Sequence, residues 1–174
     1  TVPNPVSMLE IDDYTQTKRL LVNAFLQAEI IKGLVAKINI GFDDQNGVRN
    51  SYIPTTTLYG KQEGGKASKS MAQQFDRLLE ATVNYNFNIA KAHKFNILAG
   101  YSYQDFNNEG FSAANSQFFT DIFKYNSLAS GEAARPTVAS NKSKTMFISY
   151  FGRINYNLFD KYLFTLTARV DGSN

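Results

Sequence analysis

One segment, from Gly60 to Lys66, has the spacing Gly-x-x-x-x-Gly-Lys of a phosphate-binding loop. In such a loop, backbone N–H groups surround the phosphates, and a Ser or Thr after the lysine places its hydroxyl on Mg²⁺. Here Ala67 stands at that position, and the preceding Thr-Thr-Thr-Leu-Tyr is a poor buried strand. We therefore interpret the segment as a flexible loop tip that contains Gly and Lys, and not as a nucleotide site.

A second group of residues carries oxygen ligands suited to Ca²⁺. Asp43, Asp44 and Asn46 precede Gly47, but the twelve-residue calcium loop with its closing Glu is missing. A solvated turn is therefore the preferred interpretation.

Residues suited to catalysis are few and isolated. His93 is the only histidine and lies between Lys91 and Lys94, so it has no partner for a catalytic pair or a metal site. Cysteine is absent, which excludes thiolate chemistry. The adjacent Asp12 and Asp13 lie in a polar leader segment without the marks of an acid/base couple. The sequence predicts no catalytic, cofactor-binding or metal-ligating residue, no cofactor and no enzyme.

Six segments alternate between apolar and polar residues, which is typical of strands with two different faces. They predict strands at about 18–31, 34–44, 75–88, 94–105, 144–158 and 161–172. No position on the apolar face is charged. That face carries Leu20, Val22, Ala24, Leu26, Ala28 and Ile30, then Leu34, Ala36, Ile38, Ile40 and Phe42, then Leu79, Ala81, Val83, Tyr85 and Phe87, then Phe95, Ile97, Ala99, Tyr101 and Tyr103, then Met146, Ile148, Tyr150, Gly152, Ile154, Tyr156 and Leu158, and finally Tyr162, Phe164, Leu166, Ala168 and Val170.

The opposite face of these strands is mainly polar. One interpretation of its charged positions is contact with an internal domain or a polar substrate. The other is a ladder of charged side chains that pair with one another across neighbouring strands, and we favour the ladder for most of them. They are Arg19, Glu29, Lys37, Glu80, Arg153, Arg169 and Asp171. Apolar residues interrupt this face at Leu21, Phe25, Val35, Leu78, Leu98, Phe147, Phe151 and Leu163.

The connections between the segments alternate in length. Short turns are expected at 31–33, 88–94 and 159–161, and long loops at about 44–74 and 105–145. This alternation is typical of bacterial outer-membrane barrels, in which the long loops face outside and aromatic residues line the membrane interfaces. No apolar run approaches the ~18 residues of a membrane helix.

The second long loop contains several aromatic residues among polar ones. They either stack on sugars or dock a partner lipoprotein, or they pack between loops, and the sequence does not decide between these alternatives. These residues are Phe111, Phe118, Phe119, Phe123 and Tyr125.

These patterns predict an all-β fold, a segment of an antiparallel transmembrane β-barrel with six strands in three hairpins. Its partners would include outer-membrane lipids, since a barrel turns its apolar face to lipid. The formal net charge of +3 is too small and too evenly spread for nucleic-acid binding. The chain begins without Met and ends inside a predicted strand, so we expect it to be a piece of a longer protein. The alternative fold is a soluble β-sandwich domain, whose strands also alternate between apolar and polar residues.

The final 25 residues read YFGRINYNLFDKYLFTLTARVDGSN and resemble a stretch of the SusC/RagA-type TonB-linked outer membrane proteins of Bacteroidetes. In that family a strand ending in R-x-N-Y is followed by a short turn, D-K-Y, a second strand and R-x-D-G-S. The Asn4-Pro5 opening and the segments 29–34 and 95–103 are similar to the same family. Asn174 departs from it, since Ser is usual there. The matching residues are Arg153, Asn155, Tyr156, Asp160, Lys161, Tyr162, Arg169, Asp171, Gly172 and Ser173.

The resemblance implies a TonB-dependent receptor of the cell outer membrane, with a plugged barrel of the 22-stranded type. It implies import of glycans or peptides, powered through TonB and assisted by a SusD-like surface lipoprotein. The chain would supply wall and outer loops, because the plug domain and the TonB box are not in this sequence. The resemblance identifies no substrate-binding residue. The alternatives are a structural or adhesive outer-membrane barrel without transport, or the soluble β-sandwich.

Overall fold

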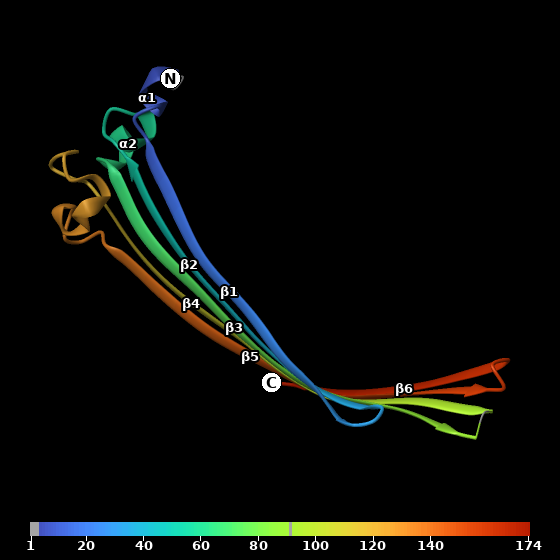
Figure 1. Cartoon of the computed structure of the whole chain (residues 1–174). Helices are drawn as coiled ribbons and strands as arrows, with labels where there is room; N and C mark the ends of the chain where they lie inside the picture. Colours follow the sequence, from blue (N-terminus) through green and yellow to red (C-terminus); the bar gives the residue numbers. More distant parts are fainter. Residues whose placement is uncertain (1–3, 91) are drawn as a thin grey trace. The chain divides into compact units, whose positions relative to one another are not determined.

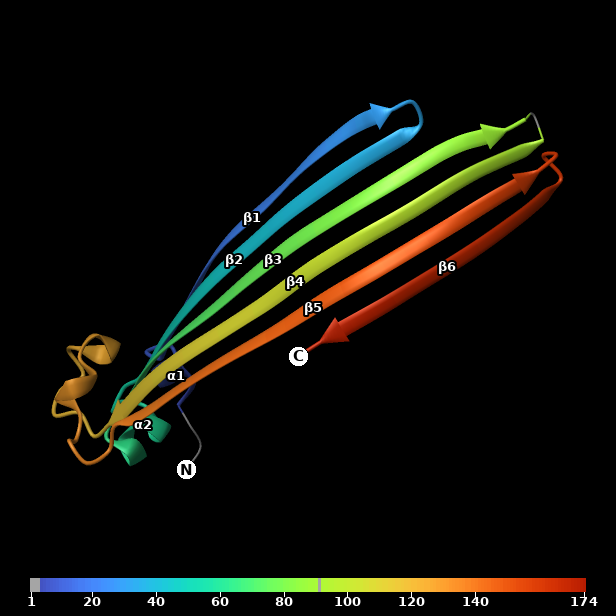
Figure 2. The same cartoon turned by 90° about the horizontal axis from the view of Figure 1, so that it is seen from below.

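The computed structural model describes residues 4–90 and 92–174, and its strands form one sheet. The sheet has six strands in sequence order, β1 (Asp12–Ile31), β2 (Leu34–Ile53), β3 (Lys66–Ile89), β4 (His93–Ser116), β5 (Thr137–Leu158) and β6 (Tyr162–Ser173) (Figures 1 and 2). Consecutive strands are neighbours, as in a chain of hairpins. The predicted all-β sheet of six antiparallel strands is therefore confirmed. A sandwich is wrong for the described residues, because they form no second sheet.

Short helices lie outside the sheet. They are α1 (Pro5–Met8), α2 (Leu58–Glu63) and the 3₁₀ turns η1 (Lys124–Asn126) and η2 (Leu128–Ser130). Within residues 4–90 and 92–174, no helix has the length and apolar character needed to cross a membrane.

The chain divides into two compact units, which are described separately. Among the described residues, the loop unit comprises 4–19, 45–74 and 108–143, and the wall unit comprises 20–44, 75–90, 92–107 and 144–174. In the wall unit, the turns of the three hairpins lie at the same end (Figure 2).

The strands extend further from the short turns than the sequence predicts. β2 continues to Ile53, β3 begins at Lys66, β4 continues to Ser116 and β5 begins at Thr137. The predicted loop bounds of about 44–74 and 105–145 are therefore wrong, and the connections are only 54–65 and 117–136. The prediction used the alternation between apolar and polar residues, and this alternation stops where the apolar face stops. Backbone pairing between strands does not depend on side-chain polarity, so the strands continue beyond that point.

The short turns are built by left-handed backbone. Gly33 has a φ of +83°, and a Cβ there would lie 2.2 Å from the backbone oxygen of Asn86. Phe159 and Asp160 both have a φ of 55°. Since side chains other than Gly rarely adopt this conformation, the turn before β6 is strained, and the one before β2 requires glycine.

Buried apolar side chains occur only in the loop unit among the described residues. Tyr52, Ala67 and Phe118 form its core, with Tyr125 and Leu128 packed against them. In the wall unit the buried residues are Asp105 and Ser149, both polar. The wall unit thus has no apolar core of its own.

Candidate functional site

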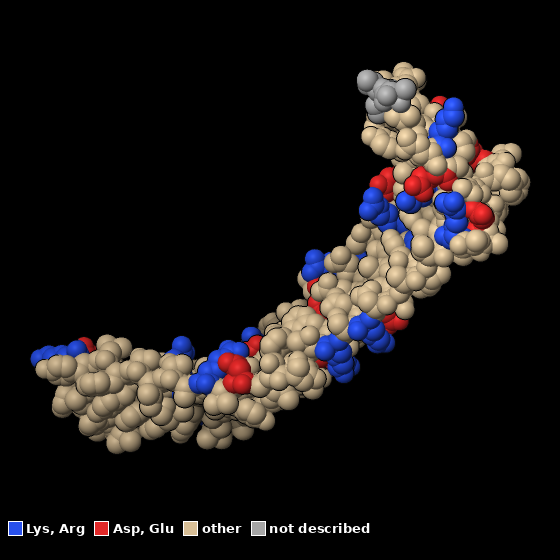
Figure 3. Space-filling model, turned by 180° about the vertical axis from the view of Figure 1, so that it is seen from behind, with Lys and Arg blue, Asp and Glu red and all other residues tan. Residues whose placement is uncertain are grey.

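The pairing of β5 with β6 brings the predicted apolar positions onto one face. Tyr156 lies opposite Phe164, Ile154 opposite Leu166, and Gly152 pairs with Ala168. Val170 remains 70% exposed and Leu26 72% exposed. Figure 3 shows a broad uncharged surface at the end that holds the short turns. An exposed sheet face of this kind is suited to lipid, because water selects polar side chains.

Aromatic rings cross this face from strand to strand near the short turns. The ring of Tyr85 stacks on Phe87 at 4.9 Å between centroids, and Phe87 stacks on Phe95 at 5.1 Å. Phe95 stacks on Tyr156 at 4.7 Å, and Tyr156 on Phe164 at 6.0 Å. We call these five residues the aromatic row. Such a row is the expected girdle of an outer-membrane barrel at one interface.

His93 lies next to the aromatic row. Its ring is nearly parallel to that of Tyr156, with centroids 5.9 Å apart, and its Nδ1 lies 2.6 Å from the Tyr156 hydroxyl. Beside it, the Lys94 ammonium lies 2.7 Å from the Asp160 carboxylate and joins the start of β4 to the turn before β6. The hydrogen bond from Lys94 lowers the pKa of Asp160. These contacts position turns and rings, and they form no catalytic pair.

The opposite face of the wall unit carries a ladder of amides. The Asn96 Nδ2 donates to the Oδ1 atoms of Asn84 and Asn86, both at 2.7 Å. The Asn155 Nδ2 donates to Asn96 Oδ1 at 3.1 Å, and the Thr165 hydroxyl donates to Asn155 Oδ1 at 3.0 Å. The ladder spans β3 to β6 and makes this face polar and suited to water.

Several charged residues of the polar face contact their own strand or uncharged groups of the neighbouring strand. Arg169 pairs with Asp171 on the same strand at 2.8 Å, and its Nη2 donates to Ser149 on β5. Lys37 lies over the ring of Phe25, and Glu29 accepts from the backbone N–H of Gly33 at 2.8 Å. For Lys37, Glu29 and the Arg169–Asp171 pair, the expected ladder of ion pairs between neighbouring strands is therefore wrong.

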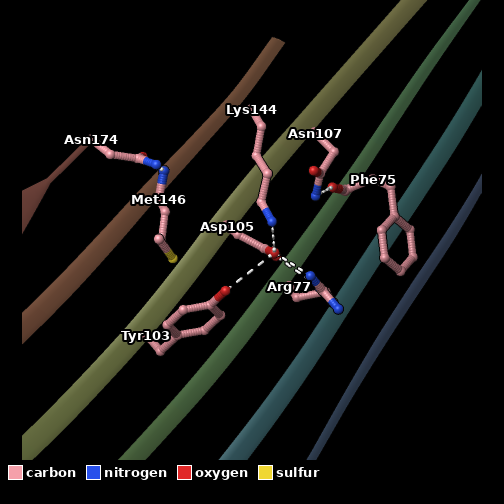
Figure 4. A network of polar contacts seen from close by, with 8 residues as sticks. All are labelled: Phe75, Arg77, Tyr103, Asp105, Asn107, Lys144, Met146 and Asn174. Atoms are coloured by element: carbon pink, nitrogen blue, oxygen red, sulfur yellow. Dashed lines mark hydrogen bonds and ion pairs between the residues drawn. The ribbon is translucent and has the colours of Figure 1, made fainter. Parts of the chain in front are cut away.

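An ionic cluster lies on the apolar face at the end far from the aromatic row. The Arg77 Nε donates to Asp105 Oδ1 at 2.8 Å, and a second bond joins the Arg77 Nη2 to Oδ2 (Figure 4). Lys144 Nζ lies 4.0 Å from the same carboxylate, and the Tyr103 hydroxyl 3.4 Å. Phe75, two residues from Arg77, stacks on Phe42 of the apolar face. The sequence interpretation missed this cluster, although it continues the alternation of β3, β4 and β5.

The two connections 54–65 and 117–136 are joined in the loop unit. The backbone N–H of Phe118 donates to the Gly64 oxygen at 2.8 Å, and the ring of Phe118 packs edge-on against Tyr52. The Asp121 carboxylate accepts from the hydroxyls of Tyr52 and Thr55. Burial raises the pKa of Asp121, but these hydrogen bonds outweigh it and the net pKa is lowered.

The strand ends of the loop unit are joined by ion pairs. Asp13 of β1 pairs with Arg49 of β2 at 2.6 Å, and Asp12 pairs with Lys124 of η1 at 2.6 Å. These two carboxylates are thus part of a strand and not of a polar leader, and each is neutralised by its own partner.

The aromatic residues predicted for the second loop divide into two groups. Phe118 is 7% exposed and Tyr125 packs against the core, so both serve packing within the loop unit. Phe119 is 79% exposed and contacts Phe123 at 6.5 Å, and the intervening Ile122 is 82% exposed. We call Phe119, Ile122 and Phe123 the exposed loop patch. Phe111 lies in β4 and is half-exposed.

The segment that resembles a phosphate-binding loop is mostly helix α2 with a glycine turn. Thr57 caps the helix by accepting from the Gly60 N–H at 2.9 Å, and a Cβ on Gly60 would lie 1.9 Å from the Pro54 oxygen. The interpretation as a flexible loop tip is therefore wrong, because Gly60 is buried inside ordered structure.

The proposed oxygen ligands Asp43, Asp44 and Asn46 lie inside β2, so the expected turn is wrong. Over residues 4–90 and 92–174, no group of three His, Cys, Asp or Glu side chains is placed to hold a metal ion.

The residues of the family motif occupy the last hairpin. Arg153, Asn155 and Tyr156 lie in β5, and Asp160 and Lys161 in the turn. Asn155 belongs to the amide ladder and Tyr156 to the aromatic row, and Asp160 forms an ion pair with Lys94. The remaining members lie in β6 and are Tyr162, Arg169, Asp171, Gly172 and Ser173. Their role as a family motif stays a prediction.

Comparison with known proteins gives several relatives of one kind. The chain is 35% identical over 174 residues to TonB-dependent receptor P3 of Formosa agariphila, covering 99% of this chain and 17% of that protein. It is 35% identical over 83 residues to TonB-dependent receptor SusC of Bacteroides thetaiotaomicron, covering 48% of this chain and 8% of SusC. No family model matches the sequence.

The fold is also found in a solved structure. The structure of the RagAB peptide transporter superposes with a TM-score of 0.85 at 22% identity, over 97% of this chain and 19% of that chain. The chain spans less than a fifth of the length of these proteins. The paired polar and apolar faces, the similarity to these receptors and the shared fold identify the chain as part of the outer-membrane β-barrel of a TonB-dependent receptor of the SusC/RagA type.

Proposed function

We propose that this chain forms wall and outer loops of an importer of glycans or peptides that is energised through TonB. The observation that carries the proposal is the similarity over nearly the whole chain to TonB-dependent receptor P3. The structure supports it physically, because an apolar face suits lipid and the amide ladder suits a water-filled or plugged interior. The barrel would be of the 22-stranded type, with the connections 54–65 and 117–136 outside.

Uptake by living cells tests this proposal. We expect deletion of the full receptor gene to abolish uptake of one class of labelled oligomer, either oligosaccharides or oligopeptides, and the intact gene to restore it. Uptake should also stop when TonB is deleted, although the receptor stays in the membrane. Unchanged uptake of both classes in the deletion strain would favour the structural or adhesive barrel instead.

The exposed loop patch is our candidate for contact with a SusD-like surface lipoprotein. Its apolar side chains are held in place by the buried Phe118 and the bonded Asp121 on the same connection. The double variant Phe119→Ser/Phe123→Ser should reduce the amount of lipoprotein that copurifies with the full receptor. The matched control is Phe111→Ser, which changes a half-exposed Phe in β4. Equal copurification in both variants would contradict this role for the patch.

A further inference from the structure

The ionic cluster of Arg77, Asp105 and Lys144 lies on the apolar face, whose positions from there toward the aromatic row are uncharged. The Asp105 side chain has no exposed surface, while the side chains of Arg77 and Lys144 are 44% and 52% exposed. One carboxylate between two basic groups gives these three side chains together a net positive charge (Figure 4). An anion bound at this surface would neutralise that charge.

The geometry of the donors leaves room for that anion. Asp105 accepts two bonds from Arg77, which fixes the guanidinium relative to the carboxylate. The Lys144 ammonium lies 4.0 Å from the carboxylate, beyond hydrogen-bonding distance, so Asp105 does not use its N–H donors. A phosphate can therefore bond to Lys144 and to the remaining N–H groups of Arg77.

The position of the cluster along the strands identifies the kind of anion. Phe95 of the aromatic row and Asp105 are ten residues apart on β4, as are Phe87 and Arg77 on β3. At ~3.3 Å per residue and a tilt of about 45°, this separation corresponds to a height of roughly 23 Å. The apolar band of outer-membrane barrels is about 25 Å tall. The cluster thus lies at the headgroup level of the leaflet opposite to the short turns.

We propose that Arg77 and Lys144, held by Asp105, bind the phosphate of a lipid in that leaflet. The acyl chains would lie on the apolar face beside the cluster, where Tyr101 contacts Tyr150 and Tyr150 is 62% exposed. A phosphorylated glycolipid of the lipid A class fits, since it combines a phosphate with several acyl chains. The inference rests on the outer-membrane location of the barrel and is independent of what the receptor imports.

Binding of purified lipid A to the full receptor tests the proposal. Native mass spectrometry in detergent would measure the affinity for bisphosphorylated lipid A and for its phosphate-free analogue. Two variants probe the site: Lys144→Gln, which leaves the Arg77–Asp105 pair intact, and Arg77→Gln/Asp105→Asn, which removes both charges of the pair together. The matched control is Lys32→Gln, the same charge change in a short turn at the other end of the wall unit. A heat-modifiability gel confirms that each variant is folded.

The expected result is about a fivefold loss of lipid A affinity in Lys144→Gln, the factor that corresponds to about 1 kcal/mol per basic residue at an anionic surface. Lys32→Gln should bind like the unmodified receptor, and the phosphate-free analogue should bind equally weakly to all of them. Unchanged lipid A affinity in both site variants would overturn the proposal. Displacement of the lipid by millimolar inorganic phosphate would also overturn it, because the site would then recognise a free anion.

Discussion

In the loop unit, Tyr52, Ala67 and Phe118 are buried by protein atoms, whereas in the wall unit the aliphatic side chains of β6 all point to the surface. The loop unit is therefore organised like a small water-soluble domain, with a core and bonded polar groups around it. The wall unit has the reverse arrangement on its apolar face and depends on lipid to cover that face. The two units belong to one sheet, but apolar side chains are covered by protein in the loop unit and by lipid in the wall unit.

The comparison also explains where charge is tolerated. In the loop unit, Asp13 and Arg49 pair at the surface in water, where such a pair contributes little to stability. In the wall unit, Asp105 is fully covered and bonded to Arg77 on the apolar face. Removing one partner there would leave an uncompensated buried charge, which is far more costly.

The largest effect is expected from emptying the core of the loop unit. Phe118→Ala should destabilise this unit by about 3–5 kcal/mol, because a buried aromatic side chain is lost. Hydrogen exchange of the amides in 117–136 of the full receptor would measure the change. Phe119→Ala is the control, since the neighbouring ring is exposed and its loss should stay within about 0.5 kcal/mol. Equal protection in the two variants would mean that the loop unit has no core of its own.

A smaller effect is expected from placing a charge on the apolar face of the wall. Leu166→Arg should reduce the stability of the folded receptor in vesicles by about 2–4 kcal/mol, because an Arg in the lipid-facing band is poorly solvated. Thr165→Arg, one residue away on the polar face, should cost less, about 0.5–1.5 kcal/mol for the lost bond to Asn155. Urea titration of vesicle-inserted receptor measures both. If Thr165→Arg were the worse variant, the assignment of the two faces would be reversed.

The smallest effect is expected from pH acting on the loop unit. The pKa of Asp121 is lowered in the folded state, so its contribution to stability is complete above the ordinary value of ~3.9. That contribution should disappear as the pH falls below about 4 and through the lowered pKa. An environment-sensitive label at position 119 of the full receptor would report loosening between pH 7 and pH 2. Asp121→Asn should remove this pH dependence, and its persistence in the variant would assign it to another group.

Much of the wall unit could be predicted from the sequence, because alternation over many residues is a strong signal. The apolar positions of 146–158 and 162–170 meet across β5 and β6 as the alternation requires. The same signal ended the strands too early, since residues 45–53 and 108–116 remain paired although their polarity no longer alternates cleanly. Backbone hydrogen bonds between strands form whatever the polarity of the side chains, so the polarity pattern does not reveal where the pairing ends.

The loop unit and the ionic cluster could be predicted only in part. Nothing in the sequence distinguishes the buried Phe118 from the exposed Phe119, because their difference comes from contacts with Tyr52 and Gly64, which are distant in the chain. Arg77 and Asp105 are likewise 28 residues apart, and their pairing follows from the register of β3 and β4. Their parity with the apolar positions of the predicted strands 75–88 and 94–105 was a usable signal that the sequence interpretation did not follow.

The bond between Gly64 and Phe118 joins two connections that are separate in the sequence. The two connections are therefore coupled, and we expect a partner that displaces α2 to displace the exposed loop patch as well. The same bond restricts how the surface of the receptor can diversify during evolution. An insertion in one connection is tolerated only if it preserves the backbone position of the other, so the two should change together among related receptors.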